Sequence, residues 1–289
     1  MSRPRVSVIV PFAGSQEELR EVVARLRGLR HDDWDELIVA DNRAAPADPD
    51  DLGPVRWLRA GGVAAPGAAR NAGAAAASGE WLVFVDADVE PPTGLLDAYF
   101  ESPPGERTAV LAGGIDDVAA RDTLAARYVS ARGMMDHRTT LVHPHAPYAQ
   151  TANCAVRREA FEAVRGFDEE ARWGEDADLC WRLRQAGWEL EERPGARVAH
   201  RNRDTLRTLL GQQSGHGAGA RWLNRRHPGA SPPPSLRALA GQARWCLGRA
   251  ARSARAGDRE GARFALVDLL ARYAFEIGRL RSNRPRALG

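Results

Sequence analysis

Apolar residues in the first third of the chain occur in short runs separated by segments with a different periodicity. These runs predict buried β-strands at residues 6–10, 36–40, 55–58 and 81–85. Between the first two runs, apolar residues recur every three or four positions and predict a helix, which Ser15 and Glu18 would begin with a capping box. An Ala-rich segment at residues 67–78 predicts a second helix. Alternating strands and helices predict an α/β fold with a mainly parallel sheet.

Polar residues follow several of these strands. Pro11, Asp41 and the pair Asp86 and Asp88 each stand at the C-terminal end of a predicted strand. Ligands bind at these ends in open parallel sheets. Two carboxylates one residue apart suit Mg²⁺ or Mn²⁺, whose remaining positions are commonly filled by substrate phosphates. Taken alone, such a pair also fits a solvated turn.

A second acidic cluster follows Gly174 at the start of a predicted helix and contains Glu175, Asp176 and Asp178. Negative charge near a helix N-terminus is favourable, so these acids could simply cap the helix. The preceding order of segments indicates a more specific role. A small polar strand near Thr151, a helix and a Gly-Phe-Asp turn lead directly into the cluster.

Composition narrows the chemistry. All 41 basic residues are Arg, and the absence of Lys excludes any mechanism that requires a lysine. Cys154, Cys180 and Cys246 lack the spacing of a metal site and suit a reducing compartment. The chain has no run of 18 apolar residues and no signal-peptide pattern at its N-terminus. A cytoplasmic location without a transmembrane helix is therefore expected.

Charge is distributed unevenly along the chain. Residues 1–119 hold 11 Arg and 20 acidic residues, whereas residues 201–289 hold 18 Arg and 5 acidic residues. The acidic front fits a metal site. The basic tail fits anionic phosphates, an anionic membrane surface or a subunit interface, and no nucleic-acid partner is expected.

Six motifs together resemble the family 2 glycosyltransferases, which are inverting enzymes with the GT-A fold. In chain order the motifs occupy residues 8–11, 40–42, 67–73, 86–88, 166–169 and 174–179. The resemblance covers about residues 5–200. It implies transfer of a sugar from a nucleotide diphosphate sugar to an acceptor hydroxyl, with Mg²⁺ or Mn²⁺ as cofactor. The family often has Asp-Asp-Gly-Ser after the second strand, where this chain has Ala40-Asp41-Asn42-Arg43.

The resemblance also implies roles by position. Donor-nucleotide binding would fall to Pro11, Phe12, Asp41, Arg70, Asp86 and Ala87, with Asp41 holding the base and Arg70 near the diphosphate. Asp86 and Asp88 would bind the metal. Asp176 would be the general base, with Glu175 as the fallback. The acceptor side would include Thr151, Asn153 and Trp173.

Histidines add two open questions. His200 follows a short strand, where it would either complete the metal site or serve the structure, since a neutral imidazole is a suitable third ligand for Mn²⁺. His143 and His145 flank Pro144, and an acceptor-side loop is favoured there over a metal site.

Two other functions must be weighed against glycosyl transfer. The segment Asp86–Val89 also resembles the nucleophile motif of haloacid-dehalogenase phosphatases, but that chemistry normally needs a downstream Lys. A non-catalytic sugar-nucleotide-binding protein could keep the same fold, although the presence of both acidic clusters argues against a dead site. The favoured function is non-processive transfer of one sugar to a lipid-linked or small-molecule acceptor.

The C-terminal region predicts a separate element. Residues 1–227 are expected to form the catalytic domain, and residues 228–289 a Pro-containing linker with a basic helical extension. An apolar stripe in the last helix is formed by Leu266, Leu270, Tyr273, Ile277 and Leu280. The favoured arrangement is a helical hairpin packed on the catalytic domain or on a partner subunit in a homo-oligomer. The alternative is peripheral attachment to the inner face of a membrane.

Overall fold

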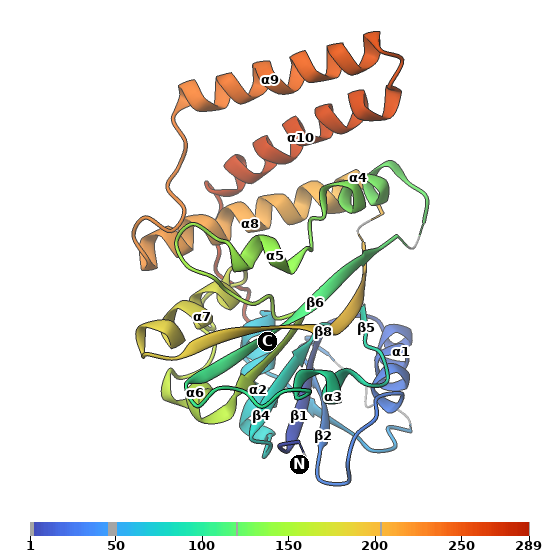
Figure 1. The fold of residues 1–289 in the computed structure, drawn as a ribbon, viewed down its shortest axis with the longest axis vertical. Helices are drawn as coiled ribbons and strands as arrows, with labels where there is room; N and C mark the ends of the chain where they lie inside the picture. The colour runs from blue at the N-terminus through green and yellow to red at the C-terminus, as the bar shows by residue number, and fades with distance from the viewer. Residues whose placement is uncertain (1–2, 46–50, 120, 203, 289) are drawn as a thin grey trace. The chain divides into compact units, whose positions relative to one another are not determined.

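A computed structural model describes residues 3–45, 51–119, 121–202 and 204–288 (Figure 1). The chain divides into two compact units. The first unit comprises residues 1–118, 135–201 and 284–289, and the second comprises residues 119–134 and 202–283. The predicted boundary between residues 227 and 228 falls inside the second unit.

Within the described residues, the first unit holds an eight-stranded sheet in the order β3-β2-β1-β4-β7-β6-β8-β5. The strands are β1 (Val6–Phe12), β2 (Glu36–Asp41), β3 (Val55–Arg59), β4 (Trp81–Val85), β5 (Val89–Glu90), β6 (Thr108–Val118), β7 (Asn153–Arg157) and β8 (Glu189–Arg201). Strands β1 to β4 are parallel to one another, as are β6 and β8. Strand β7 is antiparallel to both of its neighbours, and β5 is antiparallel to β8. The α/β fold with a mainly parallel sheet is confirmed.

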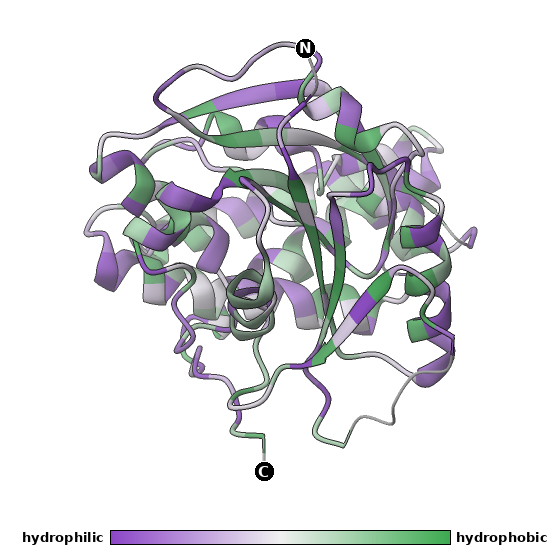
Figure 2. Ribbon diagram, turned by 90° about the horizontal axis from the view of Figure 1, so that it is seen from below, coloured by the Kyte–Doolittle hydropathy of each residue, from purple (hydrophilic) through white to green (hydrophobic). Residues whose placement is uncertain are grey.

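Two apolar cores cover the two faces of this sheet. The helices of the first unit are α1 (Gln16–Arg27), α2 (Pro66–Ala76), α3 (Leu95–Tyr99), α5 (His137–Leu141), α6 (Arg158–Ala163) and α7 (Glu175–Gln185). Alternate residues of β1 separate the cores: Val8 packs with α1 and α3 on one face, and Ile9 packs with α2, α6 and α7 on the other. Figure 2 shows the central strands as strongly hydrophobic.

Local sequence features position helices α1 and α2. The predicted capping box of Ser15 and Glu18 begins α1. Helix α2 lies close to the sheet because Gly73 faces Ile9, where any Cβ atom would collide with the Ile9 side chain. This close approach carries Arg70, on the same helix, towards the ends of the strands.

The second unit contains α4 (Leu124–Arg132), α8 (Leu206–Arg226), α9 (Leu236–Arg255) and α10 (Arg259–Gly278). Helix α10 packs against both α8 and α9 (Figure 1). The predicted hairpin of two C-terminal helices is therefore present, as α9 and α10. None of the helices in the described part of the chain is both long and apolar enough to cross a membrane.

The apolar stripe of α10 does not form the packed side of the hairpin. Its members are exposed, whereas the acidic residues on the opposite side, Asp268 and Glu276, are largely buried among arginines. Small residues of α10 make the packing contact with α8 instead. Gly278 lies so close to the backbone of Ser214 in α8 that a Cβ atom at this position would collide with it.

Candidate active site

The strand ends deliver their carboxylates to one region, but each carboxylate meets a different partner. Asp86, directly after β4, accepts a hydrogen bond from Arg70 Nη2 at 2.7 Å. Arg70 Nη1 donates to Glu175 Oε1 at 2.9 Å. One buried guanidinium therefore joins the end of β4 to the start of α7, which are 89 residues apart in the sequence.

Arg70 is fully charged in this position. Its side chain is 3% exposed, and its guanidinium also lies over the Phe167 ring. Burial alone would lower the pKa of Arg70, but the carboxylates of Asp86 and Glu175 outweigh it and raise the pKa. The ion pairs of Arg70 with Asp86 and Glu175 were not predicted from the sequence.

Glu175 and Asp176 begin α7 but differ in their surroundings. Glu175 is buried against Arg70, whereas Asp176 is partly exposed and accepts a hydrogen bond from the Ala177 backbone N–H at 2.8 Å. Burial raises the pKa of both carboxyl groups. The charge of Arg70 partly offsets this rise for Glu175, and the hydrogen bond from Ala177 partly offsets it for Asp176. A partly exposed carboxylate with a raised pKa accepts a proton more readily than an ordinary aspartate does.

Asp178, the third acid of this cluster, belongs to the structure of the helix. It is fully buried and its Oδ2 lies 2.7 Å from Arg182 Nε, one turn further along α7. Arg182 also donates to the backbone carbonyls of Val164 and Gly166. This pair fixes the helix to the Gly-Phe-Asp turn before it.

Asp88 and His200 face each other across β5 and β8. His200 Nε2 lies 3.6 Å from Asp88 Oδ2, and the imidazole is buried. Asp117 is the register partner of His200 on the adjacent strand β6. Within the described residues, the Nδ1 atom of His200 and the Oδ1 atom of Asp117 are buried without a hydrogen-bond partner.

A carboxylate suits Mn²⁺ or Mg²⁺ and a neutral imidazole suits Mn²⁺, and the buried, unpartnered Nδ1 leaves room for a second contact to the ring. Among the described residues, however, no group of three or more acidic, Cys or His side chains is close enough to hold an ion. The expected trio of Asp86, Asp88 and His200 is not assembled, because Asp86 is turned to Arg70. Asp88 lies beside His200, and Asp86 lies beside Arg70.

The expected base-binding residue Asp41 is enclosed by neighbours. Its carboxylate is fully buried and accepts hydrogen bonds from Trp57 Nε1 at 3.0 Å and from Arg43 Nη2 at 2.6 Å. Burial would raise the pKa of Asp41, but the hydrogen bonds from Arg43 and Trp57 outweigh it and lower the pKa. The Arg43 guanidinium also lies over the Phe12 ring at 5.3 Å. A nucleotide base must therefore meet or displace Arg43 before it reaches Asp41.

The remaining expected residues separate into groups. Asn153 is 1% exposed. Its side-chain amide accepts a hydrogen bond from the Tyr99 hydroxyl and donates to the carbonyls of Gly114 and Ala196, so it joins strands rather than lining an acceptor site. Thr151 is buried and Trp173 is partly exposed. Pro11 lies at the end of β1 beside Ala40.

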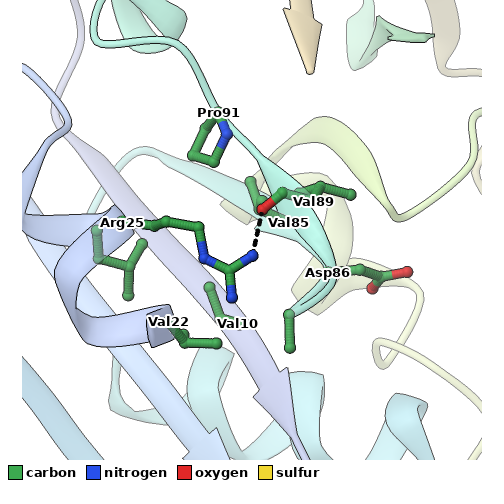
Figure 3. Close-up of a pocket in the computed structure, with 9 residues that line it drawn as sticks. Val10, Val22, Arg25, Val85, Asp86, Val89 and Pro91 are labelled. Atoms are coloured by element: carbon green, nitrogen blue, oxygen red, sulfur yellow. Dashed lines mark hydrogen bonds between the residues drawn. The ribbon is translucent and has the colours of Figure 1, made fainter. Parts of the chain in front are cut away.

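A small apolar hollow lies beside the site and shares Asp86 with it. It is lined mainly by residues of α1, β4 and β5, including Arg25, whose guanidinium donates to the Val89 carbonyl at 3.0 Å. Figure 3 shows the carboxylate of Asp86 directed away from Arg25. Ala87 lines this hollow and packs against the core.

Three residues near the site were not selected from the sequence: Arg43, Asp117 and Tyr148. Tyr148 comes from the loop of His143 and His145, and Asp176 contributes to the raised pKa of its hydroxyl after burial. Arg43 and Asp117 both stand at strand ends, which is a signal that the sequence could have given. Tyr148 follows no such pattern, because only folding brings its loop to α7.

Comparisons with known proteins identify the family and the fold. Residues 7–165 match the family described as Glycosyl transferase family 2. A curated protein named pre-mycofactocin glycosyltransferase, from Mycobacterium tuberculosis, is 34% identical over 236 residues, which cover 79% of this chain and 49% of that protein. The chain thus spans about half the length of this relative.

Solved structures share the fold at lower sequence identity. The mannosyltransferase PcManGT from Pyrobaculum calidifontis, in complex with GDP-Man and Mn²⁺, has a TM-score of 0.62 at 16% identity and covers 94% of this chain and 87% of its own. Glucosyl-3-phosphoglycerate synthase from Mycobacterium tuberculosis, in complex with Mn²⁺ and UDP, has a TM-score of 0.52 at 20% identity, covering 81% and 82%. Both likenesses concern the GT-A fold.

Proposed function

Because the chain belongs to the family 2 glycosyltransferases and has a GT-A fold, we propose that it transfers one sugar from a nucleotide diphosphate sugar to an acceptor hydroxyl, with inversion at the anomeric carbon. The observation that carries this proposal is the buried Arg70 between Asp86 and Glu175. It fixes the end of β4, where a donor diphosphate would lie, to the helix that presents Asp176.

Asp176 is the proposed general base. In a single displacement, the acceptor oxygen forms a bond to the anomeric carbon, the bond from that carbon to the diphosphate oxygen breaks, and the acceptor proton must leave. Asp176 is partly exposed and its raised pKa matches this proton transfer. Glu175 is occupied by Arg70 and is a positioning residue in this scheme.

Asp88 and His200 would hold a divalent metal ion together with the donor diphosphate. When bound, such an ion stabilises negative charge on the departing diphosphate. Asp117 is proposed to accept a hydrogen bond from His200 Nδ1, because both atoms are buried without partners on paired strands. This contact would keep Nε2 directed towards Asp88.

Pro11, Phe12, Asp41 and Arg43 are proposed to bind the nucleotide base, and Arg70 and Asp86 to lie near the diphosphate. The loop with His143, His145 and Tyr148 is proposed to meet the acceptor, together with Thr151 and Trp173. His145 and Trp181 meet edge-to-face with ring centroids 4.6 Å apart, so Trp181 of α7 supports this loop. Cys154, Cys180 and Cys246 are free thiols, which supports a cytoplasmic location.

Binding to the donor provides the first test. UDP-, GDP- and dTDP-sugars should be screened by thermal shift with and without Mn²⁺, because a ligand of the native state raises the melting temperature. One donor is expected to stabilise the protein only when Mn²⁺ is present. Asp88→Asn should remove the Mn²⁺-dependent part, while Asp97→Asn, a similarly exposed carboxylate, should keep it. Equal metal dependence in both variants would contradict the assignment.

Turnover separates the alternatives. Release of the free nucleotide diphosphate with a glycosylated product is expected, and binding without turnover would favour a non-catalytic sugar-nucleotide-binding protein. The family match leaves no support for the haloacid-dehalogenase alternative.

A further inference from the structure

The second unit carries an extended apolar face on α9 and α10. We define this apolar face by Leu236, Leu247, Leu266, Leu270, Tyr273, Ile277 and Leu280. The exposed fraction of these side chains runs from 39% at Tyr273 to 85% at Leu236. Contiguous apolar patches of this kind on a protein surface mark interaction sites.

The α10 part of the face is one continuous stripe. Leu266, Leu270, Tyr273 and Ile277 are spaced by four, three and four residues, so they lie along one side of the helix, and Leu280 follows just after the helix ends. The opposite side is used for packing and ion pairs. Asp268 on that side pairs with Arg132 of α4 at 2.7 Å and with Arg249 of α9 at 3.5 Å.

The α9 part lies on the same side of the hairpin. Arg249 pairs with Asp268 and covers the Trp245 ring, so Trp245 belongs to the side of the hairpin on which α4 packs. Leu247 follows Trp245 by two residues, or about 200° around the helix, and therefore faces the other side. Leu236 stands 11 residues before Leu247, close to a whole number of turns, and shares its direction.

Arginines surround the apolar face. Helix α9 contains five Arg and no acidic residue. Arg237 and Arg255 each stand nine residues from buried Cys246, and Arg244 stands two residues from it. These spacings place all three on the outer side of α9, and all three are exposed. Arg259 and Arg263 continue the stripe of α10 towards its N-terminus and are also exposed. The second unit holds 18 Arg against 6 acidic residues.

We propose that this apolar face docks onto the surface of a bilayer that contains anionic phospholipids. Aliphatic side chains and Tyr273 would enter the boundary between headgroups and acyl chains, while the arginines meet the phosphates. A bilayer is favoured because its negative phosphates complement the arginines around the apolar face. A second copy docking through the same face would bring two arginine-rich surfaces together, and their repulsion opposes that contact.

Vesicle co-sedimentation of the full chain tests the proposal. Phosphatidylglycerol-containing vesicles should retain the protein, pure phosphatidylcholine vesicles should not, and added salt should release it. The double variant Leu270→Glu/Ile277→Glu should weaken retention by at least about tenfold, because charged side chains replace two that enter the lipid. Trp34→Glu is the control, since Trp34 has the same 52% exposure as Ile277 but lies in the first unit.

A second variant guards against misfolding. Arg237→Gln/Arg244→Gln changes only exposed helix positions, and it should weaken retention on anionic vesicles while its melting temperature stays that of the wild type. Equal retention on neutral and anionic vesicles would overturn the proposal. So would unchanged retention of both double variants, or a solution dimer that Leu270→Glu/Ile277→Glu dissociates while vesicle binding persists. None of these results depends on donor binding.

Discussion

The two units of this protein treat charge and apolar surface in opposite ways. In the first unit, Arg70, Asp41 and Glu175 are buried, and their charges are balanced within the strand-end region. In the second unit, Ile277 and Leu280 are exposed, while carboxylates such as Asp268 are held between helices by arginines. Burying a charged group costs free energy, and leaving apolar surface exposed forgoes the free energy that its burial would contribute. Each departure therefore marks where its unit is expected to interact: with a small anionic donor in one case and with an extended surface in the other.

The largest effect is expected from removing the buried cation of the first unit. Arg70→Met should destabilise the fold by about 3 kcal/mol, because it leaves Glu175 buried without its partner while the partly exposed Asp86 can be solvated. Chemical denaturation measures this change. Arg56→Met, at an exposed arginine, should cost less than about 1 kcal/mol. Equal losses would mean that burial of Arg70 has no special role.

A loss of catalysis without a loss of fold is expected at the partly exposed acid. Asp176→Asn should lower transfer by at least about 10²-fold and keep donor binding, because only the proton acceptor is removed. Product formation and calorimetric donor affinity provide the two readouts. Near-normal transfer with inverted product would exclude Asp176 and return the role of base to Glu175.

A smaller effect, on nucleotide affinity, is expected from removing the buried carboxylate of Asp41. Asp41→Ala should weaken nucleotide binding by about 1–3 kcal/mol, since a base donor would lose its buried acceptor. Trp57→Phe removes one hydrogen bond to Asp41 and keeps the ring, so it serves as the control for local structure. If Asp41→Ala and Trp57→Phe bind every nucleotide like the wild type, Asp41 has only a structural role.

Packing in the second unit depends on small residues at the crossing of α8 and α10. Gly217→Ala should destabilise the protein by about 1–3 kcal/mol, because the new Cβ atom would collide with the Phe275 carbonyl. Gly211→Ala in the same helix has open space around it and should stabilise the helix by about 0.5–1 kcal/mol. Two changes of the same sign, measured by denaturation, would contradict this packing.

The smallest expected change is a shift in pH dependence. The raised pKa of Asp176 predicts that falling pH abolishes transfer at a higher pH than an ordinary aspartate would give, because the base acts only when deprotonated. Glu175→Gln leaves the charge of Arg70 less balanced, which should lower the pKa of Asp176 and move this acid limb to lower pH. A pH profile of kcat/KM in both proteins tests the shift. If the acid limb of the pH profile stays in place in Glu175→Gln, Glu175 does not influence the pKa of the catalytic base.

The sequence by itself determined the elements and the chemistry at their ends. Periodicity predicted β1, β2, β3 and β4, the capping box predicted the start of α1, and the ordered motifs identified the family. These features are local, because hydrogen bonding within a turn and the alternation of a strand depend on nearby residues.

Only the tertiary structure decided which partner each side chain meets. It turned Asp86 to Arg70 instead of leaving it with Asp88, enclosed Asp41 beneath Arg43, and placed Asn153 between strands. It also left the stripe of α10 exposed. A periodic pattern states that one side of a helix is apolar, but what covers that side depends on contacts between residues far apart in the chain, which no local spacing encodes.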